Sequence, residues 1–141
     1  MLAGLVLDSS LALAWGLPDE HSDQADRLLN QISGDKNLWV PALWWYEIGN
    51  ALMMAQKRNR IKEADRLRLW QLYGLLPILT DGPFSEAIRR IQELALSYSL
   101  SVYDASYLEL ALRKGLPLAT FDRRLLQAAT QAGVEIAAKA D

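Results

Sequence analysis

Close to the start of the sequence, a short uninterrupted apolar run, Leu5-Val6-Leu7, ends at Asp8 and two serines. A continuous apolar run bounded by small polar residues is typical of a β-strand that is buried on both faces. Such strands occur mainly in parallel sheets, whose helical crossovers cover the sheet on both sides. Asp8 is then expected at the carboxyl end of the strand, where open α/β sheets place their ligand crevices.

The rest of the chain alternates between short apolar runs and segments with helical periodicity. Further strands are predicted at 38–40, 76–79, 116–119 and 134–136, and helices at 11–15, 19–32, 42–58, 62–73, 83–95, 103–114 and 122–131. Short strands that alternate with helices favour a parallel sheet covered on both faces. We therefore predict an α/β fold, a three-layer α/β/α sandwich with a parallel sheet of about five strands, formed by residues 1–141 as a single domain.

Composition limits the classes of function. The hydrophobic fraction of 51% indicates an ordered globule, and the net charge of −2 excludes a generic polyanion binder, so nucleic-acid affinity needs local basic groups or bound cations. The absence of cysteine excludes disulfides and thiolate metal sites. The first apolar run is too short for a signal peptide or a membrane span, so we expect a cytoplasmic protein with no membrane association.

Two acidic residues follow predicted strands. Asp8 comes after the first strand, and Asp122 comes after the strand at 116–119, each directly before a helix. Taken singly, each has an ordinary explanation as the N-cap of that helix.

Two further acids fall on helix faces that are expected to be buried. Asp104 shares a stripe with Leu108, whereas Glu109 and Arg113 are expected on the solvent side of the same helix. Glu47 lies in the most apolar helix, 42–58. The alternatives are a capping interaction of Asp104 with Ser101 and an ion pair of Glu47 with a base such as Arg58.

The four acids together point to a cation. Carboxylates that converge repel one another unless cations neutralise them. Oxygen ligands without histidine or cysteine favour Mg²⁺ or Mn²⁺ over zinc. The single histidine, His21, is expected at the surface without a partner, which argues against a Ser-His-Asp triad. Asp81 is expected to cap the helix at 83–95, and Asp19 to open the helix at 19–32.

The helix at 42–58 is apolar nearly all round, which indicates burial on two sides. One stripe contains Trp44, Ile48 and Leu52. Either a protein partner or the following loop and helix of the same chain covers the other side. Candidate partner contacts are Trp44, Trp45, Tyr46 and Met53.

Basic residues occur in two places that suit phosphate contacts. One group follows the apolar helix, and the other comes directly after Asp122: Lys57, Arg58, Arg60, Lys62, Arg123 and Arg124. Solvated helix ends explain the first group equally well.

Four motifs follow one another along the chain: Val6-Leu7-Asp8-Ser9-Ser10, Trp45-Tyr46-Glu47-Ile48-Gly49-Asn50-Ala51-Leu52, Tyr103-Asp104-Ala105-Ser106-Tyr107-Leu108-Glu109-Leu110-Ala111 and Leu118-Ala119-Thr120-Phe121-Asp122-Arg123-Arg124-Leu125. In this order they resemble the motifs of the PIN-domain nucleases, and within them the VapC-type toxins of toxin–antitoxin pairs. The resemblance covers essentially the whole chain.

The resemblance implies a single PIN-like domain that hydrolyses RNA phosphodiester bonds with one or two Mg²⁺ or Mn²⁺ ions. By the same resemblance, Asp8, Glu47, Asp104 and Asp122 are the catalytic and metal-binding residues, and Ser10 and Thr120 support them. An antitoxin that blocks the acidic pocket, a homodimer and an RNA substrate are the expected partners. Family members often carry a further acid or Asn shortly after the last Asp, whereas Arg123 and Arg124 stand here.

Two other classes of function compete with a nuclease. Haloacid-dehalogenase phosphatases also begin with a strand ending in Asp but need a second acid where Ser10 stands, and receiver proteins need neighbouring acids and a later strand-end Lys. Neither pattern fits. A non-catalytic PIN-like module that binds protein or RNA is the stronger alternative.

Overall fold

The computed structural model describes residues 4–32, 37–82 and 85–138, and its centre is a parallel sheet. The five strands stand in the order β3-β2-β1-β4-β5, and all neighbours are parallel. Their bounds are β1 Gly4–Leu7, β2 Asn37–Pro41, β3 Ile78–Asp81, β4 Leu118–Ala119 and β5 Ile136–Ala138. The first strand is central, because Val6 is in register with Trp39 on one side and Leu118 on the other.

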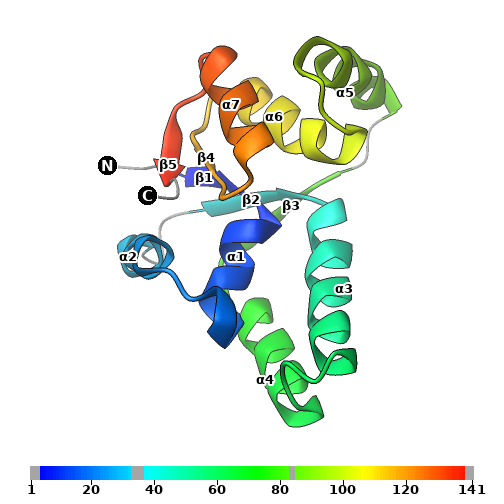
Figure 1. The fold of residues 1–141 in the computed structure, drawn as a ribbon. Helices are drawn as coiled ribbons and strands as arrows, with labels where there is room; N and C mark the ends of the chain where they lie inside the picture. Colours follow the sequence, from blue (N-terminus) through cyan, green and yellow to red (C-terminus); the bar gives the residue numbers. More distant parts are fainter. Residues whose placement is uncertain (1–3, 33–36, 83–84, 139–141) are drawn as a thin grey trace.

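Helices cover both faces of this sheet (Figure 1). Their bounds are α1 Ser9–Gly16, the 3₁₀ turn η1 Pro18–Glu20, α2 Asp23–Gln31, α3 Leu43–Lys57, α4 Glu63–Gly74, α5 Ser85–Tyr98, α6 Val102–Lys114 and α7 Arg123–Gln131. Helices α5, α6 and α7 lie on one face, and α1 to α4 lie on the other. The predicted α/β fold with three layers and a parallel five-stranded sheet is confirmed.

Burial of β1 follows directly from its sequence. Leu5, Val6 and Leu7 are essentially inaccessible to solvent because helices pack on both faces of the central strand. Burying a side chain of this size contributes about 1.5–3 kcal/mol relative to leaving it exposed. Packing therefore holds the strand in place, and with it the position of the polar residues that follow it.

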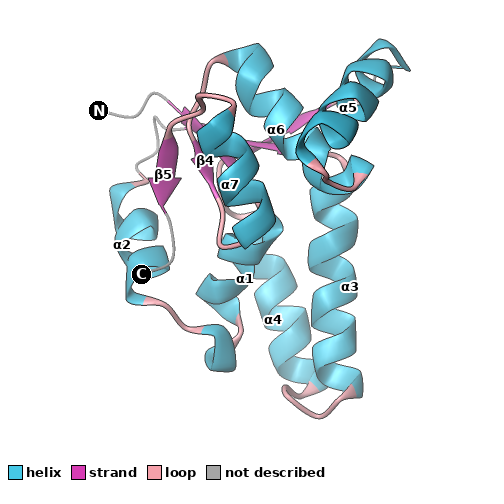
Figure 2. Cartoon of the chain, turned by 45° about the horizontal axis from the view of Figure 1, so that its top comes forward, coloured by secondary structure: helices cyan, strands magenta, loops and turns pink. Residues whose placement is uncertain are grey.

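Helices α3 and α4 run side by side as a hairpin (Figure 2). Trp44 is completely buried and meets Tyr73 of α4 edge to face, while Trp45 meets Trp70 in the same geometry at 5.9 Å between ring centroids. The same chain therefore covers part of the second apolar side of α3. Trp44 is not a partner contact as predicted, since none of its surface reaches solvent.

Two local expectations were wrong, and a third cannot be compared with the described residues. The helix predicted from Asp19 is a short 3₁₀ turn followed by α2, because Ser22 caps α2 by accepting a hydrogen bond from the Ala25 amide. The third strand begins at Ile78, two residues later than predicted. Asp81 ends that strand and pairs with Arg113, and the helix start at Pro83 that it was predicted to cap lies outside the described residues.

Across the part of the chain that the structure describes, none of the helices combines the length and the hydrophobicity needed to cross a membrane.

Candidate metal centre and active site

Asp8 lies where β1 turns into α1, and two hydroxyl groups hold its carboxylate. Ser10 Oγ and Thr120 Oγ1 both donate to Oδ2, at 2.5 and 2.7 Å. Asp8 occupies the N-cap position of α1, but its side chain makes no capping hydrogen bond. Oδ1 makes no hydrogen bond to any described residue, so one oxygen is fixed and the other remains available.

Thr120 joins the two strand ends. Its hydroxyl donates to Asp8 and accepts a hydrogen bond from the Asp122 amide, while Ser10 Oγ accepts one from the Phe121 amide. These contacts tie the segment after β4 to the segment after β1. Ser10 and Thr120 therefore both lie beside Asp8.

Glu47 projects from the second turn of α3 and is held in the same manner as Asp8. Ser9 Oγ donates to its Oε1 at 3.3 Å, and the Tyr107 hydroxyl of α6 donates to the same oxygen. Its Oε2 makes no hydrogen bond within the described chain. The alternative of an ion pair with Arg58 or another base does not hold among the described residues.

Asp104 and Asp122 lie at the starts of α6 and α7. Ser101 caps α6 by accepting a hydrogen bond from the Asp104 amide, so the predicted capping interaction exists and uses the backbone of Asp104. Asp122 caps α7 through Oδ1, which accepts a hydrogen bond from the Leu125 amide. Its N-cap explanation is therefore correct, and its Oδ2 has no hydrogen-bond partner among the described residues.

Burial and neighbouring charges raise the pKa values of Asp8, Glu47 and Asp104. Burial raises the pKa of Asp8 from its ordinary value of 3.8 to about 6, the Ser10 and Thr120 hydroxyls oppose this, and the charges of Glu47 and Asp104 add to it. Burial also raises the pKa of Glu47, and the charge of Asp104 raises it further. For Asp104, burial and then the charge of Asp122 raise the pKa. The four predicted acids thus form one electrostatically coupled group.

Glu109 provides a comparison, because it is the other deeply buried carboxylate among the described residues. It is 2% exposed, whereas the sequence placed it on the solvent side of α6. That prediction was wrong, because Arg113 Nε at 2.8 Å and Arg90 Nη1 at 3.6 Å neutralise it inside the fold. Asp8, at 4% exposed, has no base within ion-pair distance in the described chain. A buried charge without a partner is costly, so the acidic group is left for an external cation.

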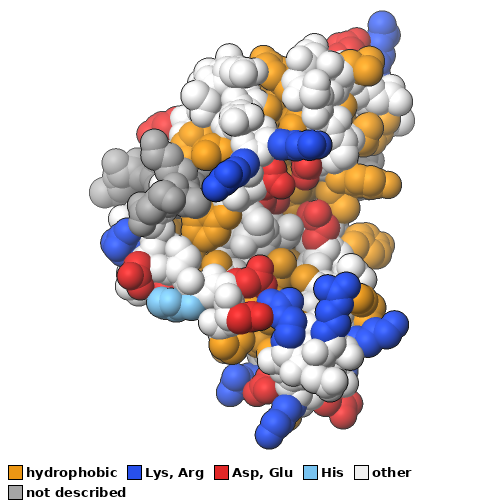
Figure 3. All heavy atoms as spheres, viewed as in Figure 1, with side chains coloured by type: hydrophobic (Ala, Val, Ile, Leu, Met, Phe, Trp, Pro, Cys, Tyr) orange, Lys and Arg blue, Asp and Glu red, His pale blue; other side chains and the backbone are white. Residues whose placement is uncertain are grey.

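The donor set fits a hard divalent cation. Its ligands are carboxylate oxygens surrounded by hydroxyls, without imidazole or thiolate, which is the chemistry that Mg²⁺ and Mn²⁺ prefer. Figure 3 shows acidic side chains gathered near the middle of one face, with Lys and Arg side chains on either side of them. No three of the four acids bring ligand atoms within 4.8 Å of one another.

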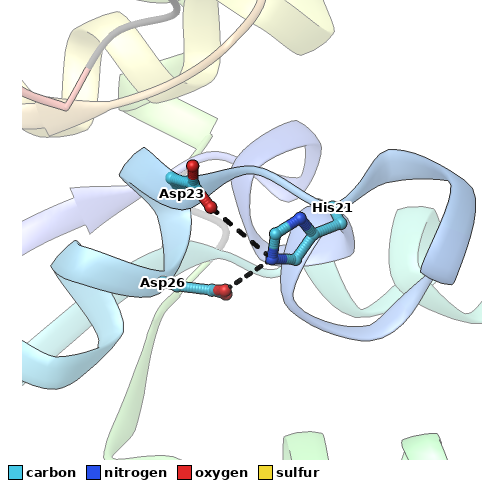
Figure 4. A group of neighbouring side chains, drawn as sticks. All are labelled: His21, Asp23 and Asp26. Carbon is cyan, nitrogen blue, oxygen red and sulfur yellow. Dashed lines mark hydrogen bonds and ion pairs between the residues drawn. The ribbon is translucent and has the colours of Figure 1, made fainter.

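Only one group of described residues reaches that spacing, and it lies elsewhere. His21, Asp23 and Asp26 converge at the start of α2 (Figure 4). His21 Nε2 is 2.8 Å from Asp26 Oδ2, so the expectation of a partnerless His21 was wrong. His21 and Asp23 are exposed and Asp26 is partly exposed, and the two acids are favoured at the positive end of the helix dipole. This is an ordinary hydrogen-bonded cluster at the surface.

The comparisons with known proteins agree with the fold and extend over most of the chain. Residues 5–131 match the model of the PIN domain. The chain belongs to the PIN-domain family. A ribonuclease VapC3 of Pyrobaculum aerophilum is 32% identical over 127 residues, covering 87% of this chain and 92% of the relative. Ribonuclease VapC9 of Mycobacterium tuberculosis is 35% identical over 121 residues, covering 86% and 87%.

Solved PIN-domain structures share this architecture. PAE2754 from Pyrobaculum aerophilum is 31% identical with a TM-score of 0.64, covering 90% of this chain and 79% of that one. VapBC2 from Rickettsia felis, solved with a promoter DNA fragment, has a TM-score of 0.71 at 10% identity, covering 98% and 99%. The latter likeness concerns the fold alone.

Two residues that contact the acids of this PIN domain were not predicted as site residues. Tyr107 stands three residues after Asp104, and Ser9 directly follows Asp8. Helical spacing places Tyr107 on the same face as Asp104, which was the available signal. The sequence did not reveal that the phenol reaches across to α3, because that contact depends on how two helices cross.

Proposed function

We propose that this protein is a metal-dependent endoribonuclease that acts as the toxin of a toxin–antitoxin pair. The observation that carries the proposal is the acidic group around the carboxyl ends of β1 and β4, in which neither Asp8 nor Glu47 has a base within ion-pair distance among the described residues. Its PIN-domain relatives named VapC ribonucleases support the reaction class.

Asp8, Glu47, Asp104 and Asp122 are the residues that hold Mg²⁺ or Mn²⁺ in this proposal. A bound divalent cation supplies a Lewis acid that polarises the phosphate and makes a water molecule a stronger nucleophile. The chain's own part is to keep ligand oxygens pointing into the site. Ser10 and Thr120 fix Asp8 by Oδ2 and leave Oδ1 for the metal.

Arg123 and Arg124 are the residues that we assign to the RNA phosphates. Both are exposed at the start of α7, next to Asp122, and neither forms an ion pair with a described residue. Arg60 is a poorer candidate than the sequence indicated, because Asp19 and Glu20 bind its guanidinium at 2.7 and 3.2 Å. Single-stranded or looped RNA is the proposed substrate, since one strand has to enter an acidic pocket.

The partners follow from the exposed face of α3. Tyr46 is 78% exposed, and Met53 lies two turns later on the same side of the helix. We assign this face to contacts with a cognate antitoxin and with a second copy of the chain. Residues 1–141 act as a single PIN-like domain in the cytoplasm.

The test is cleavage of a mixed pool of single-stranded RNA by the purified protein, with Mg²⁺, with Mn²⁺ or with EDTA. Cleavage is expected only with a metal, and Asp8→Asn is expected to abolish it. Glu86→Gln, which removes an exposed acid from α5, serves as the matched control and is expected to cleave normally.

Two results would contradict the proposal. Cleavage that persists in EDTA would show that no divalent metal is needed. Absence of cleavage, together with no stabilisation of the fold by either metal, would leave a PIN-like binding module as the function.

A further inference from the structure

Tyr107 connects two helices that each carry an acid of the site. It is completely buried in α6, one turn after Asp104, and its hydroxyl donates to Glu47 Oε1 on α3. Ser9 approaches the same oxygen from the start of α1. Three elements far apart in the sequence therefore meet at a single carboxylate oxygen.

Glu47 needs contacts that hold its carboxylate in the site, because the nearby negative charge of Asp104 repels it. Its side chain has three rotatable bonds and is only half-buried, and the negative charge of Asp104 lies close enough to raise its pKa. Fixing a glutamate side chain costs up to about 2 kcal/mol of conformational entropy. Without contacts that hold it, the carboxylate would turn toward water, where its charge is better solvated.

The chemical nature of the support matters as much as its presence. Glu109 is held by the guanidinium of Arg113, which cancels its charge. Glu47 is held by a phenol and an alcohol, which are neutral donors and leave the carboxylate negative. Both donors also use Oε1, so Oε2 keeps its lone pairs for a cation.

We propose that Tyr107, assisted by Ser9, is a positioning residue that sets Glu47 for divalent-metal binding without neutralising it. The inference rests on the proposed metal site and deepens it. It assigns to α6 two roles one turn apart: Asp104 supplies a ligand, and Tyr107 orients the ligand that comes from the facing helix. Contacts of this kind around metal ligands typically change affinity by about 10–100-fold when removed.

The experiment measures Mn²⁺ affinity of the full chain by electron paramagnetic resonance or calorimetry, without RNA. Tyr107→Phe keeps the buried ring and removes only the hydroxyl, and we expect its Mn²⁺ affinity to fall about tenfold. Ser9→Ala removes the longer hydrogen bond and is expected to cause a smaller fall.

Tyr73→Phe is the matched control. Tyr73 is also buried, and its hydroxyl donates to the Ala12 carbonyl at 2.6 Å. Loss of that hydrogen bond is expected to lower the melting temperature and to leave Mn²⁺ affinity unchanged. A general effect of removing a buried phenol is thereby separated from an effect on the metal site.

A double-mutant cycle tests whether Tyr107 acts through Glu47. In a Glu47→Gln background, Tyr107→Phe is expected to cause no further loss of affinity. Equal affinity of Tyr107→Phe and the unmodified protein, or the same loss in both backgrounds, would overturn the inference and leave the metal site standing. Absence of Mn²⁺ binding by the unmodified protein would overturn both.

Discussion

Asp8 lowers the free energy of unfolding of the metal-free protein by an amount that depends on pH. Its pKa is raised from 3.8 to about 6 mainly by burial, so the folded state holds the proton more tightly than the unfolded state does. Below about pH 3 both states are protonated, and there is no penalty. As the pH rises through 6 the penalty becomes complete, at about 3 kcal/mol if this pKa difference is fully expressed.

Asp8→Asn is therefore expected to stabilise the protein in EDTA at pH 7 and to leave its stability nearly unchanged at pH 3. Urea unfolding at the two pH values measures this difference. The exposed-acid variant Glu86→Gln should show no comparable gain. With Mn²⁺ the order reverses, because only the unmodified protein gains the binding energy of the metal. An equal gain at both pH values would contradict burial of a charged Asp8 as the cause.

Helix α6 contributes to two separate groups of charged residues: the acidic group that includes Asp104, and a set of ion pairs around Glu109. Arg113 joins Glu109 of its own helix to Asp81 at the end of β3. Arg113→Met would leave Glu109 with Arg90 alone, 3.6 Å away. Because breaking a buried pair strands a charge, we expect a loss of about 3–5 kcal/mol in the free energy of unfolding.

The control for Arg113→Met is Arg89→Met, which removes an exposed pair with Glu93 on α5. That change should cost less than about 1 kcal/mol. Urea unfolding distinguishes the two variants. Equal losses would show that Glu109 is not dependent on Arg113.

The sequence predicted some features of α6 and missed others. Apolar runs and helical periodicity predicted the order of strands and helices along the chain, because these signals are local. They also placed Asp104 on the inner face of α6. They failed for Glu109, since an angle of about 100° per residue within α6 does not reveal that Arg90 of α5 lies beside this carboxylate and helps to neutralise it. The hydroxyl contacts to Glu47 were missed for the same reason.

The exposed side of α3 leads us to expect that two copies of the chain form a dimer. Trp45, which the sequence also indicated as a partner contact, donates its indole N–H to Thr80 and meets Trp44 and Trp70, so its removal would disturb the α3–α4 hairpin. Tyr46 is the better choice, because its side chain points to solvent.

Sedimentation of the unmodified protein is expected to give twice the chain mass of 15.8 kDa. Tyr46→Asp is expected to shift the population toward the single chain by placing a charge in an apolar contact, while Mn²⁺ affinity stays unchanged. The control is Leu96→Asp, since Leu96 is equally exposed on α5, away from the face of α3. A protein that sediments as a single chain before substitution would contradict the homodimer.

Because the net charge of the molecule is −2, RNA affinity has to arise from a local arrangement of charge. Arg123 and Arg124 occupy the first positions of α7, where the helix dipole disfavours positive charge, so helix stability does not explain them. We expect Arg123→Gln with Arg124→Gln to weaken binding of single-stranded RNA and to reduce the slope of log affinity against log salt by about 1.4, or about 0.7 for each phosphate that is no longer neutralised. Fluorescence anisotropy with Ca²⁺ measures this slope, and Lys57→Gln with Arg58→Gln removes the same charge from the far end of α3 as the control. If the control pair lowers the slope and the α7 pair does not, the RNA path runs along α3, and the assignment of Arg123 and Arg124 is wrong.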